Sequence, residues 1–216
     1  MRNKLYTEIT TYGKNFSEEE IIDFVFKAIE NGIGGINVSP NYISKLSSLL
    51  PDTINLSCPI DYPFGLSTTK VRQHQAISLI RKGCNTIDLV INPIHLVNNK
   101  KDVLLKDIDT IKKICKENEV VLRAMLEYRQ FNEEVYRETI DLCRQKQIEY
   151  LFPSTGYFAD DHIDNLIVSK MINSQYKDGK VITNGNVWKK EHYDLIEESG
   201  IYGLRLRAGY DISSIL

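Results

Sequence analysis

The fold is decided by the stretch Thr86–Asn92, TIDLVIN, and by the segments on either side of it. It is an apolar run of strand length, and it lies between two segments with the apolar spacing of amphipathic helices, residues 69–82 and 102–118. The same alternation continues in both directions along the chain. Strands separated by helices imply right-handed crossovers and a parallel sheet.

Eight such strands are predicted, at residues 5–10, 33–38, 53–59, 86–92, 120–127, 149–153, 180–183 and 203–206. The first helix is marked by a capping box, with Ser17 as N-cap and Glu20 three residues later. The other helices are predicted at 42–50, 69–82, 102–118, 133–146, 161–172 and 189–199.

Eight strand–helix units favour an α/β fold of the (β/α)8 TIM-barrel type, formed by residues 1–216 as a single domain. The rival is a doubly wound open sheet, but no G-x-G-x-x-G turn follows the first strand. After the eighth strand only residues 208–216 remain, too few for a full covering helix. We therefore expect bare apolar barrel surface there, which a partner subunit of a homo-oligomer could cover.

Composition excludes several partners. The net charge of −2 comes from 27 basic and 29 acidic side chains without blocks of one sign, which argues against nucleic acid. No apolar run approaches membrane-spanning length and the N-terminus has no signal-peptide core, so a cytoplasmic location is predicted. The four cysteines have no metal-site spacing and are expected to be small buried hydrophobes. No metal and no cofactor are predicted.

Six stretches resemble, in order and in spacing, the deoxyribose-phosphate aldolase family. They are Glu8–Thr11, Ile36–Pro40, Tyr62–Gly65 with Thr68–Val71, Thr86–Asn92, Met125–Glu127 and Ser154–Tyr157. The resemblance implies a (β/α)8 barrel. It also implies reversible cleavage of 2-deoxyribose 5-phosphate to glyceraldehyde 3-phosphate and acetaldehyde.

The departures from the family pattern lie where the family does its chemistry. By the resemblance, Phe152 stands at the imine-forming lysine, Ile182 at a second lysine, Arg123 at a third, and Arg207 at a glycine near the substrate phosphate. A phenyl ring has no lone pair to add to a carbonyl, so we expect class I (Schiff-base) aldolase activity to be lost. Lys180 faces the same side of its strand as Ile182, but about one layer nearer the bottom of the barrel.

Three residues are candidates for catalysis. Asp88 in its apolar strand is either a general acid–base or a buried carboxylate held by Arg123 or another cation. Arg123 and Glu127 form either an interior salt bridge or an anion binder with a proton-transfer group. Ligand-binding candidates share a place at or near the C-terminal ends of strands: Asn37, Tyr128, Ser154, Thr155, Asn184, Gly185, Arg205 and Arg207.

Two classes of function stay open. The first is a divergent aldolase-like protein whose barrel mouth binds a small anionic sugar phosphate or carbonyl compound, including a lyase or isomerase that uses Asp88 and Glu127. The second is a non-catalytic barrel that serves as a binding or assembly subunit. An open mouth lined by Asp88, Glu127 and Arg123 would favour catalysis. A mouth plugged by Phe152, Tyr128 and Tyr157 would favour the second class.

Overall fold

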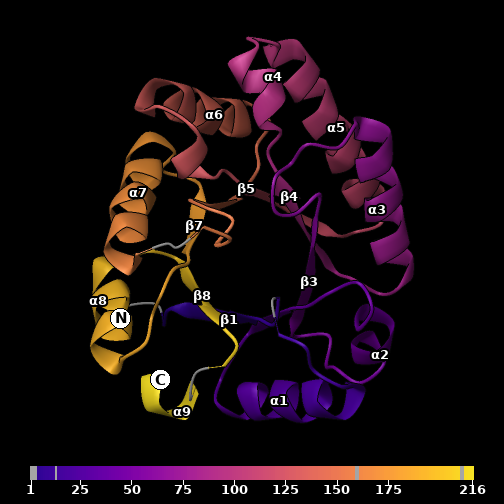
Figure 1. Cartoon of the computed structure of the whole chain (residues 1–216), viewed down its shortest axis with the longest axis vertical. Coiled ribbons are helices and arrows are strands. Elements are labelled where there is room, and N and C mark those ends of the chain that lie inside the picture. The colour runs from indigo at the N-terminus through magenta and orange to yellow at the C-terminus, as the bar shows by residue number, and fades with distance from the viewer. Residues whose placement is uncertain (1–3, 13, 159–160, 210–211) are drawn as a thin grey trace.

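A computed structural model of the chain describes residues 4–12, 14–158, 161–209 and 212–216. Eight parallel strands form a closed barrel in chain order (Figure 1). They are β1 (Tyr6–Thr10), β2 (Gly35–Asn37), β3 (Asn55–Ile60), β4 (Thr86–Val90), β5 (Val121–Met125), β6 (Tyr150–Phe152), β7 (Lys180–Thr183) and β8 (Gly203–Arg207). The TIM-barrel prediction is confirmed.

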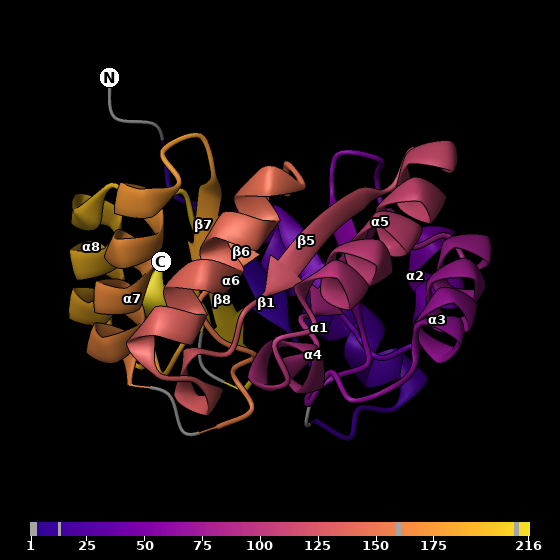
Figure 2. The ribbon, with the colours of Figure 1, turned by 90° about the horizontal axis from the view of Figure 1, so that it is seen from above.

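Helices surround the barrel. They are α1 (Glu18–Glu30), α2 (Ile43–Ser47), α3 (Thr69–Arg81), α4 (Pro93–Val97), α5 (Lys101–Glu117), α6 (Glu133–Gln145), α7 (His162–Gln175), α8 (Lys190–Ser199) and α9 (Ile212–Ile215). In Figure 2, α7 and α8 lie on one flank of the barrel, and α3 and α5 lie on the other. No helix in the described part of the chain is long and apolar enough to cross a membrane.

Helix starts follow the side-chain signals in the sequence. The Ser17 Oγ accepts a hydrogen bond from the Glu20 amide, and the Glu20 carboxylate accepts one from the Ser17 amide. At α6 the Asn132 side chain accepts from the Val135 amide. The predicted capping box at Ser17 is confirmed, and both caps offset the unsatisfied amides of a helix's first turn.

The strand register sets up the barrel interior. Glu8 on β1 lies beside Arg205 on β8, and Asp88 on β4 lies beside Arg123 on β5. Alternation along the strands sends these side chains inward and their neighbours outward to the helices. A small apolar cluster of Val90, Met125, Phe152 and Ile182 also belongs to the interior.

Two expectations about the outer layer need correction. The short helices α4 and α9, and a 3-10 turn at Tyr128–Gln130, were not predicted from the sequence. The surface near β1 and β8 is not bare, because Ile9, Leu204 and Leu206 are fully buried or nearly so. The four-residue α9 contributes to this cover, with Ile215 buried, and lies next to α8 (Figure 1).

The cysteines behave as expected. All four, Cys58, Cys84, Cys115 and Cys143, are free thiols and are buried. Burial raises the pKa of the Cys58 thiol to about 12, which removes its nucleophilic thiolate at neutral pH. They therefore contribute to packing.

Candidate functional site

Two carboxylates and two guanidinium groups form a closed ring of ion pairs in the barrel interior. Arg123 donates from Nε to Asp88 Oδ1 (2.6 Å) and from Nη1 to Glu8 Oε2 (2.7 Å). Arg205 donates from Nη2 to Asp88 Oδ2 (2.5 Å) and from Nε to Glu8 Oε1 (2.5 Å). Each acid thus touches both bases, and the four formal charges cancel. We call these four residues the charge ring.

The charge ring is buried, so its electrostatics are strong. Glu8 and Asp88 are 0% exposed, and Arg123 and Arg205 are 2% and 4% exposed. Burial alone would raise the pKa of each carboxyl, but the two guanidiniums outweigh it and hold the pKa of Glu8 and of Asp88 below its ordinary value. Burial would lower the pKa of Arg123, yet Asp88 and Glu8 together raise it. Glu8, Asp88 and Arg123 are therefore charged at neutral pH.

Neutral side chains complete the hydrogen bonding of the two acids. Tyr6 Oη donates to Glu8 Oε2 (2.9 Å) and accepts from Asn55 Nδ2 (2.9 Å). Asn37 Nδ2 donates to Asp88 Oδ2 (3.1 Å) and to Ser57 Oγ (2.9 Å). A buried ion pair needs such extra hydrogen bonds to offset the cost of leaving water.

Phe152 packs against the charge ring. Its side chain is 0% exposed, and its ring centroid lies 4.1 Å from Arg205 Cζ and 5.0 Å from Arg123 Cζ. The negative face of an aromatic ring attracts a guanidinium, more so when both are removed from water. The phenyl ring therefore interacts favourably with two cations at the position where the resemblance puts a lysine.

Lys180 lies at the opposite end of the barrel. It begins β7, whereas the mouth is formed by the C-terminal ends of the strands. Its ammonium group pairs with Glu149 (2.6 Å) and donates to the Tyr150 hydroxyl (3.3 Å). The hydrogen bond to Glu149 is the main cause of a raised pKa for Lys180, so this amine is protonated and not nucleophilic at neutral pH.

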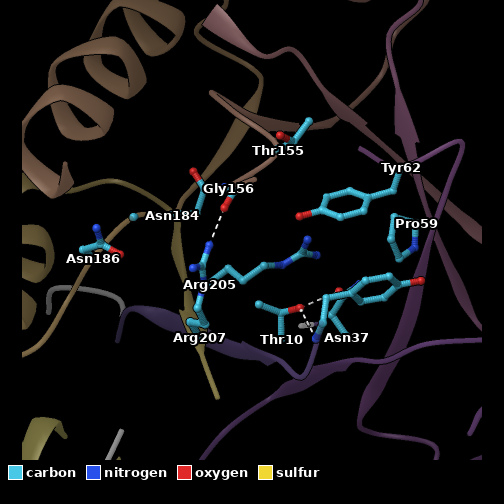
Figure 3. Close-up of a pocket in the computed structure, with 12 residues that line it drawn as sticks. Thr10, Asn37, Pro59, Tyr62, Thr155, Gly156, Asn184, Asn186, Arg205 and Arg207 are labelled. Atoms are coloured by element: carbon cyan, nitrogen blue, oxygen red, sulfur yellow. Dashed lines mark hydrogen bonds between the residues drawn. The ribbon is translucent and has the colours of Figure 1, made fainter. Parts of the chain in front are cut away.

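Above the charge ring, the mouth of the barrel contains a cavity of about 40 Å³. Figure 3 shows Arg205 extending across it toward Tyr62, while Arg207 is directed at Gly156. The residues that line it come from six of the strand ends and the loops after them: Thr10, Tyr12, Asn37, Pro59, Tyr62, Thr155, Gly156, Asn184, Gly185, Asn186, Arg205 and Arg207. We call this cavity the mouth pocket.

The chemistry of the mouth pocket suits an anion. Its described lining contains two arginines, several hydroxyl and amide groups, and no carboxylate. Arg205 is neutralised within the charge ring, whereas Arg207 is exposed and donates to the Gly156 carbonyl oxygen. Arg207 thus leaves a positive charge at the edge of the pocket that no acid in the lining compensates.

Two loops shape this side of the pocket. Asn184 Nδ2 donates to the Ser154 carbonyl (3.0 Å), and Ser154 Oγ donates to Asn184 Oδ1 (2.9 Å), which joins the loops after β6 and β7. Gly185 has a φ of +129°, and a Cβ there would come within 3.0 Å of the Asn165 side chain. Glycine is required at this position by both conformation and space.

Comparison with known proteins decides the family. Over 156 residues the chain is 30% identical to the deoxyribose-phosphate aldolase of Mycoplasmoides gallisepticum, covering 72% of this chain and 68% of that one. The chain belongs to the deoxyribose-phosphate aldolase family. The Aquifex aeolicus member is 28% identical over 153 residues, 70% of this chain and 68% of the relative. No protein-family model matches the sequence.

Solved structures agree with this assignment. The structure of QR15, an aldolase, is 25% identical and superposes with a TM-score of 0.84 over 93% of this chain and 89% of that chain. A deoxyribose phosphate aldolase from Aeropyrum pernix, described as tetrameric, shows the same fold with a TM-score of 0.83 over 97% and 87% of the two chains, at 17% identity.

The structure brings most of the ligand-binding candidates of this aldolase-family chain to the mouth pocket. Six of the eight line it: Asn37, Thr155, Asn184, Gly185, Arg205 and Arg207. Ser154 lies behind the lining and Tyr128 packs edge-on against Tyr136. Asp88 and Arg123 meet below the pocket, in the charge ring.

Glu127 does not join Asp88 and Arg123. Its Oε2 accepts hydrogen bonds from the amide (2.9 Å) and the hydroxyl (2.5 Å) of Thr155, and the side chain is buried. Glu127 itself has a left-handed backbone, with φ of +53°. Its visible role is to hold the β6 loop that lines the mouth pocket.

Sequence reasoning missed several residues of the site. Glu8 contributes to the family resemblance but was not predicted as a site residue. Alternation along the strand puts Glu8 on the same face as Tyr6 and Thr10, opposite the apolar Ile9, and this pattern was a signal for a carboxylate inside the barrel. Tyr12 and Tyr62 also line the pocket without having been predicted. They lie in loops, where periodicity carries no signal.

Neither of the two mouth geometries anticipated from the sequence, an open acidic cleft or an aromatic plug, is found. Asp88, Glu127 and Arg123 are buried and do not line an open cleft. Phe152 is buried beneath the mouth pocket, and Tyr157 is 54% exposed rather than inserted as a plug. Among the residues that the structure describes, no group of three or more His, Cys, Asp or Glu side chains is arranged to hold a metal ion.

Proposed function

We propose that this chain is a member of the deoxyribose-phosphate aldolase family that binds a small phosphorylated or otherwise anionic ligand at the barrel mouth and has lost class I aldolase activity. In this proposal residues 1–216 work as one barrel domain. A homo-oligomer and a cytoplasmic location stay predictions.

The observation that carries the proposal is the contrast between two layers of the barrel. The upper layer, the mouth pocket, is accessible and contains Arg207, a cation that has no ionic partner among the described residues. The lower layer, the charge ring, is buried and electrically neutral. A planar guanidinium beside loop amides and hydroxyls favours a phosphate or carboxylate group.

Loss of imine chemistry is supported by where the amines are. Phe152 fills the position of the imine-forming lysine, and Ile182 that of the second lysine, both with 0% exposure. Lys180 is the one lysine within the eight described strands, and its protonated amine lies at the far end of the barrel. An imine needs an unprotonated amine within reach of the carbonyl.

The acid–base alternative receives less support. A general acid or base works best with a pKa near the operating pH. The charge ring holds the pKa of Asp88 below its ordinary range, and the Glu127 carboxylate is engaged by Thr155. A binding role without catalysis therefore fits the geometry better than a lyase or isomerase that uses these two acids.

Thermal unfolding in the presence of inorganic phosphate and of 2-deoxyribose 5-phosphate tests the binding site. At about 100 times Kd, a ligand should stabilise the fold by roughly 2.7 kcal/mol. Arg207→Ala should remove this stabilisation. Arg137→Ala is the matched control, because Arg137 is an exposed arginine on α6 paired only with Glu133 among its described ionic partners. Equal stabilisation of both variants would contradict the proposal.

Borohydride reduction with 2-deoxyribose 5-phosphate tests the loss of imine chemistry. We expect no stoichiometric adduct in intact-protein mass spectra. An adduct of one equivalent that maps to a single lysine would overturn this part of the proposal. Trp188, the one tryptophan in the chain and two residues beyond Asn186, provides a fluorescence signal for binding of this non-aromatic ligand in the same samples.

A further inference from the structure

Five aromatic rings lead from the mouth pocket to the protein surface. Tyr62 lines the pocket, with its ring centroid 5.2 Å from that of Tyr12 and 6.4 Å from that of Tyr157. Tyr157 lies 5.2 Å from Phe64 and 5.4 Å from Phe158. We call Tyr12, Tyr62, Phe64, Tyr157 and Phe158 the aromatic rim. Its members come from the loops after β1, β3 and β6.

The outer part of the aromatic rim is exposed to water. Phe64 is 41% exposed and Tyr157 is 54% exposed, and Leu66 in the same loop as Phe64 is 55% exposed. Single exposed apolar side chains are ordinary, but a contiguous apolar patch beside a pocket marks a binding surface. The rings contact one another edge-on, which leaves ring surface available to a ligand.

The size of the mouth pocket limits what part of a ligand can enter it. A volume of about 40 Å³ corresponds to roughly three water-sized spheres. That is enough for one phosphate or carboxylate group, and the rest of a larger ligand would extend toward the opening of the pocket. The remainder of any ligand anchored at Arg207 must therefore lie outside the pocket, against the residues that border it.

The side chains of the aromatic rim determine which kind of group fits outside the mouth pocket. Phe64 and Phe158 carry no hydrogen-bonding group, so they cannot satisfy the hydroxyls of an open-chain sugar. A planar aromatic ring, in contrast, stacks on such side chains without any hydrogen bond. The other rim members, Tyr12, Tyr62 and Tyr157, each carry one hydroxyl, but most of the surface of all five side chains is ring carbon. The rim therefore favours a flat apolar ring over a polyhydroxylated chain.

The loop that carries Tyr62 and Phe64 is held in place before any ligand binds. Asp61 Oδ2 accepts from Arg72 Nε (3.0 Å) and from the Ser67 amide (2.8 Å), and Arg72 is fully buried. The Gly65 amide donates to the Asp61 carbonyl (2.8 Å). A rim ordered in this way loses little conformational entropy when a ligand docks.

We propose that the ligand of the mouth pocket is a phosphate monoester that carries a planar aromatic group, with the phosphate at Arg207 and the ring on the aromatic rim. This inference rests on the proposed function, because it uses the same anion site. An aryl phosphate and a nucleotide share this chemistry and differ in the sugar between phosphate and ring.

Calorimetric titration of the full chain separates these ligands. The probes are inorganic phosphate, 2-deoxyribose 5-phosphate, phenyl phosphate and adenosine 5′-monophosphate. One stacked ring is expected to strengthen binding at least about fivefold over inorganic phosphate. If phenyl phosphate binds more tightly than inorganic phosphate and adenosine 5′-monophosphate does not, the ligand is an aryl phosphate. The reverse result indicates a nucleotide.

Tyr157→Ala tests the rim directly. It should abolish the tighter binding of the aromatic probe relative to inorganic phosphate. Affinity for inorganic phosphate should stay unchanged, and this unchanged affinity would also show that the variant is folded. Phe26→Ala is the matched control, because Phe26 is an exposed ring on α1 (39%) outside the rim. Arg207→Ala should weaken every probe.

The failures of the two proposals are distinguishable. If inorganic phosphate binds and neither aromatic probe binds more tightly, the aromatic ligand is excluded and the anion site stands. The aromatic ligand is excluded as well if Tyr157→Ala and Phe26→Ala bind the aromatic probes equally. If none of the four probes binds, the proposed function itself fails.

Discussion

The uncharged side chain at position 152 fits the number of positive and negative groups around it. Glu8 and Asp88 supply two negative charges to the charge ring, and Arg123 and Arg205 supply two positive ones. A protonated lysine in place of Phe152 would leave a net positive charge in a buried layer, which is costly. The phenyl ring adds no charge and stacks on both guanidiniums. An uncharged aromatic side chain at 152 is therefore physically consistent with the charges around it.

The charge ring makes stability depend on acid pH. Because the pKa of Glu8 and of Asp88 is held below the ordinary value of about 4, the unfolded chain binds protons more readily than the folded one. Their contribution is fully present above about pH 5 and is lost as the pH falls through the folded-state pKa. We expect the free energy of unfolding, measured with urea, to decrease between about pH 5 and pH 3.

Asp88→Asn provides the comparison for this prediction. The variant should be less stable at neutral pH, since the two arginines then share one carboxylate. Its free energy of unfolding should also fall less between about pH 5 and pH 3, because one titrating group has been removed. Equal decreases in the two proteins would show that Asp88 does not contribute.

At this scale the sequence predicted part of the site. An ion pair between Asp88 and Arg123 was one of two interpretations, and strand adjacency makes it visible in the pattern. The pairing of Glu8 with Arg205 was not predicted, because the two are 197 residues apart and meet only when β1 closes against β8. A barrel's last strand pair depends on closure of the whole sheet.

At the level of elements, length decided what could be predicted. Every strand was anticipated within a few residues, because apolar runs and helical periodicity extend over enough residues to be recognised. The helices α4 and α9 span five and four residues, less than two turns, and were missed. Loops such as 61–67 have no period, so the position of Tyr62 over the mouth pocket could not be inferred.

Arg72 on α3 connects three such elements. It pairs with Asp61 in the loop after β3 and with Asp107 on α5, and it donates to the Val90 carbonyl at the end of β4. Arg72→Leu would leave the buried Asp107 carboxylate and the partly buried Asp61 carboxylate without their cation. We expect a loss of about 3–5 kcal/mol in the free energy of unfolding, measured with urea.

Arg81→Leu is the control for Arg72, on the same helix but with an exposed side chain. It should change the free energy of unfolding by no more than about 0.5 kcal/mol. If the two leucine variants were equally stable, Arg72 would not anchor these elements. Arg72→Leu can be measured for binding as well. If it lowered the affinity for aromatic phosphates more than the affinity for inorganic phosphate, Arg72 would be connected to the aromatic rim.

For the whole molecule, the two ends of the barrel are expected to do different work. In TIM barrels the C-terminal face carries function and the N-terminal face carries stability. Here the C-terminal face has the mouth pocket with Arg207, whereas Tyr6, Lys180 and Tyr202 pack together at the other end. The charge ring lies between the two ends and shares Arg205 with the mouth pocket, but its four charges cancel, so we expect a change at one end not to reach the other.

Crossed measurements on two variants test this separation. Tyr6→Phe removes the hydroxyl that joins Asn55 to Glu8. The Glu8 carboxylate keeps its bonds to Arg123 and Arg205. Loss of this hydrogen bond to a charged group should cost the variant roughly 1.5–3 kcal/mol in the free energy of unfolding. Its affinity for inorganic phosphate should not change. Arg207→Ala removes an exposed guanidinium, so the free energy of unfolding should stay within about 0.5 kcal/mol while phosphate affinity falls about tenfold or more. If Tyr6→Phe weakened phosphate binding as much as Arg207→Ala does, the charge ring would transmit changes between the ends through Arg205, which belongs both to the ring and to the lining of the mouth pocket.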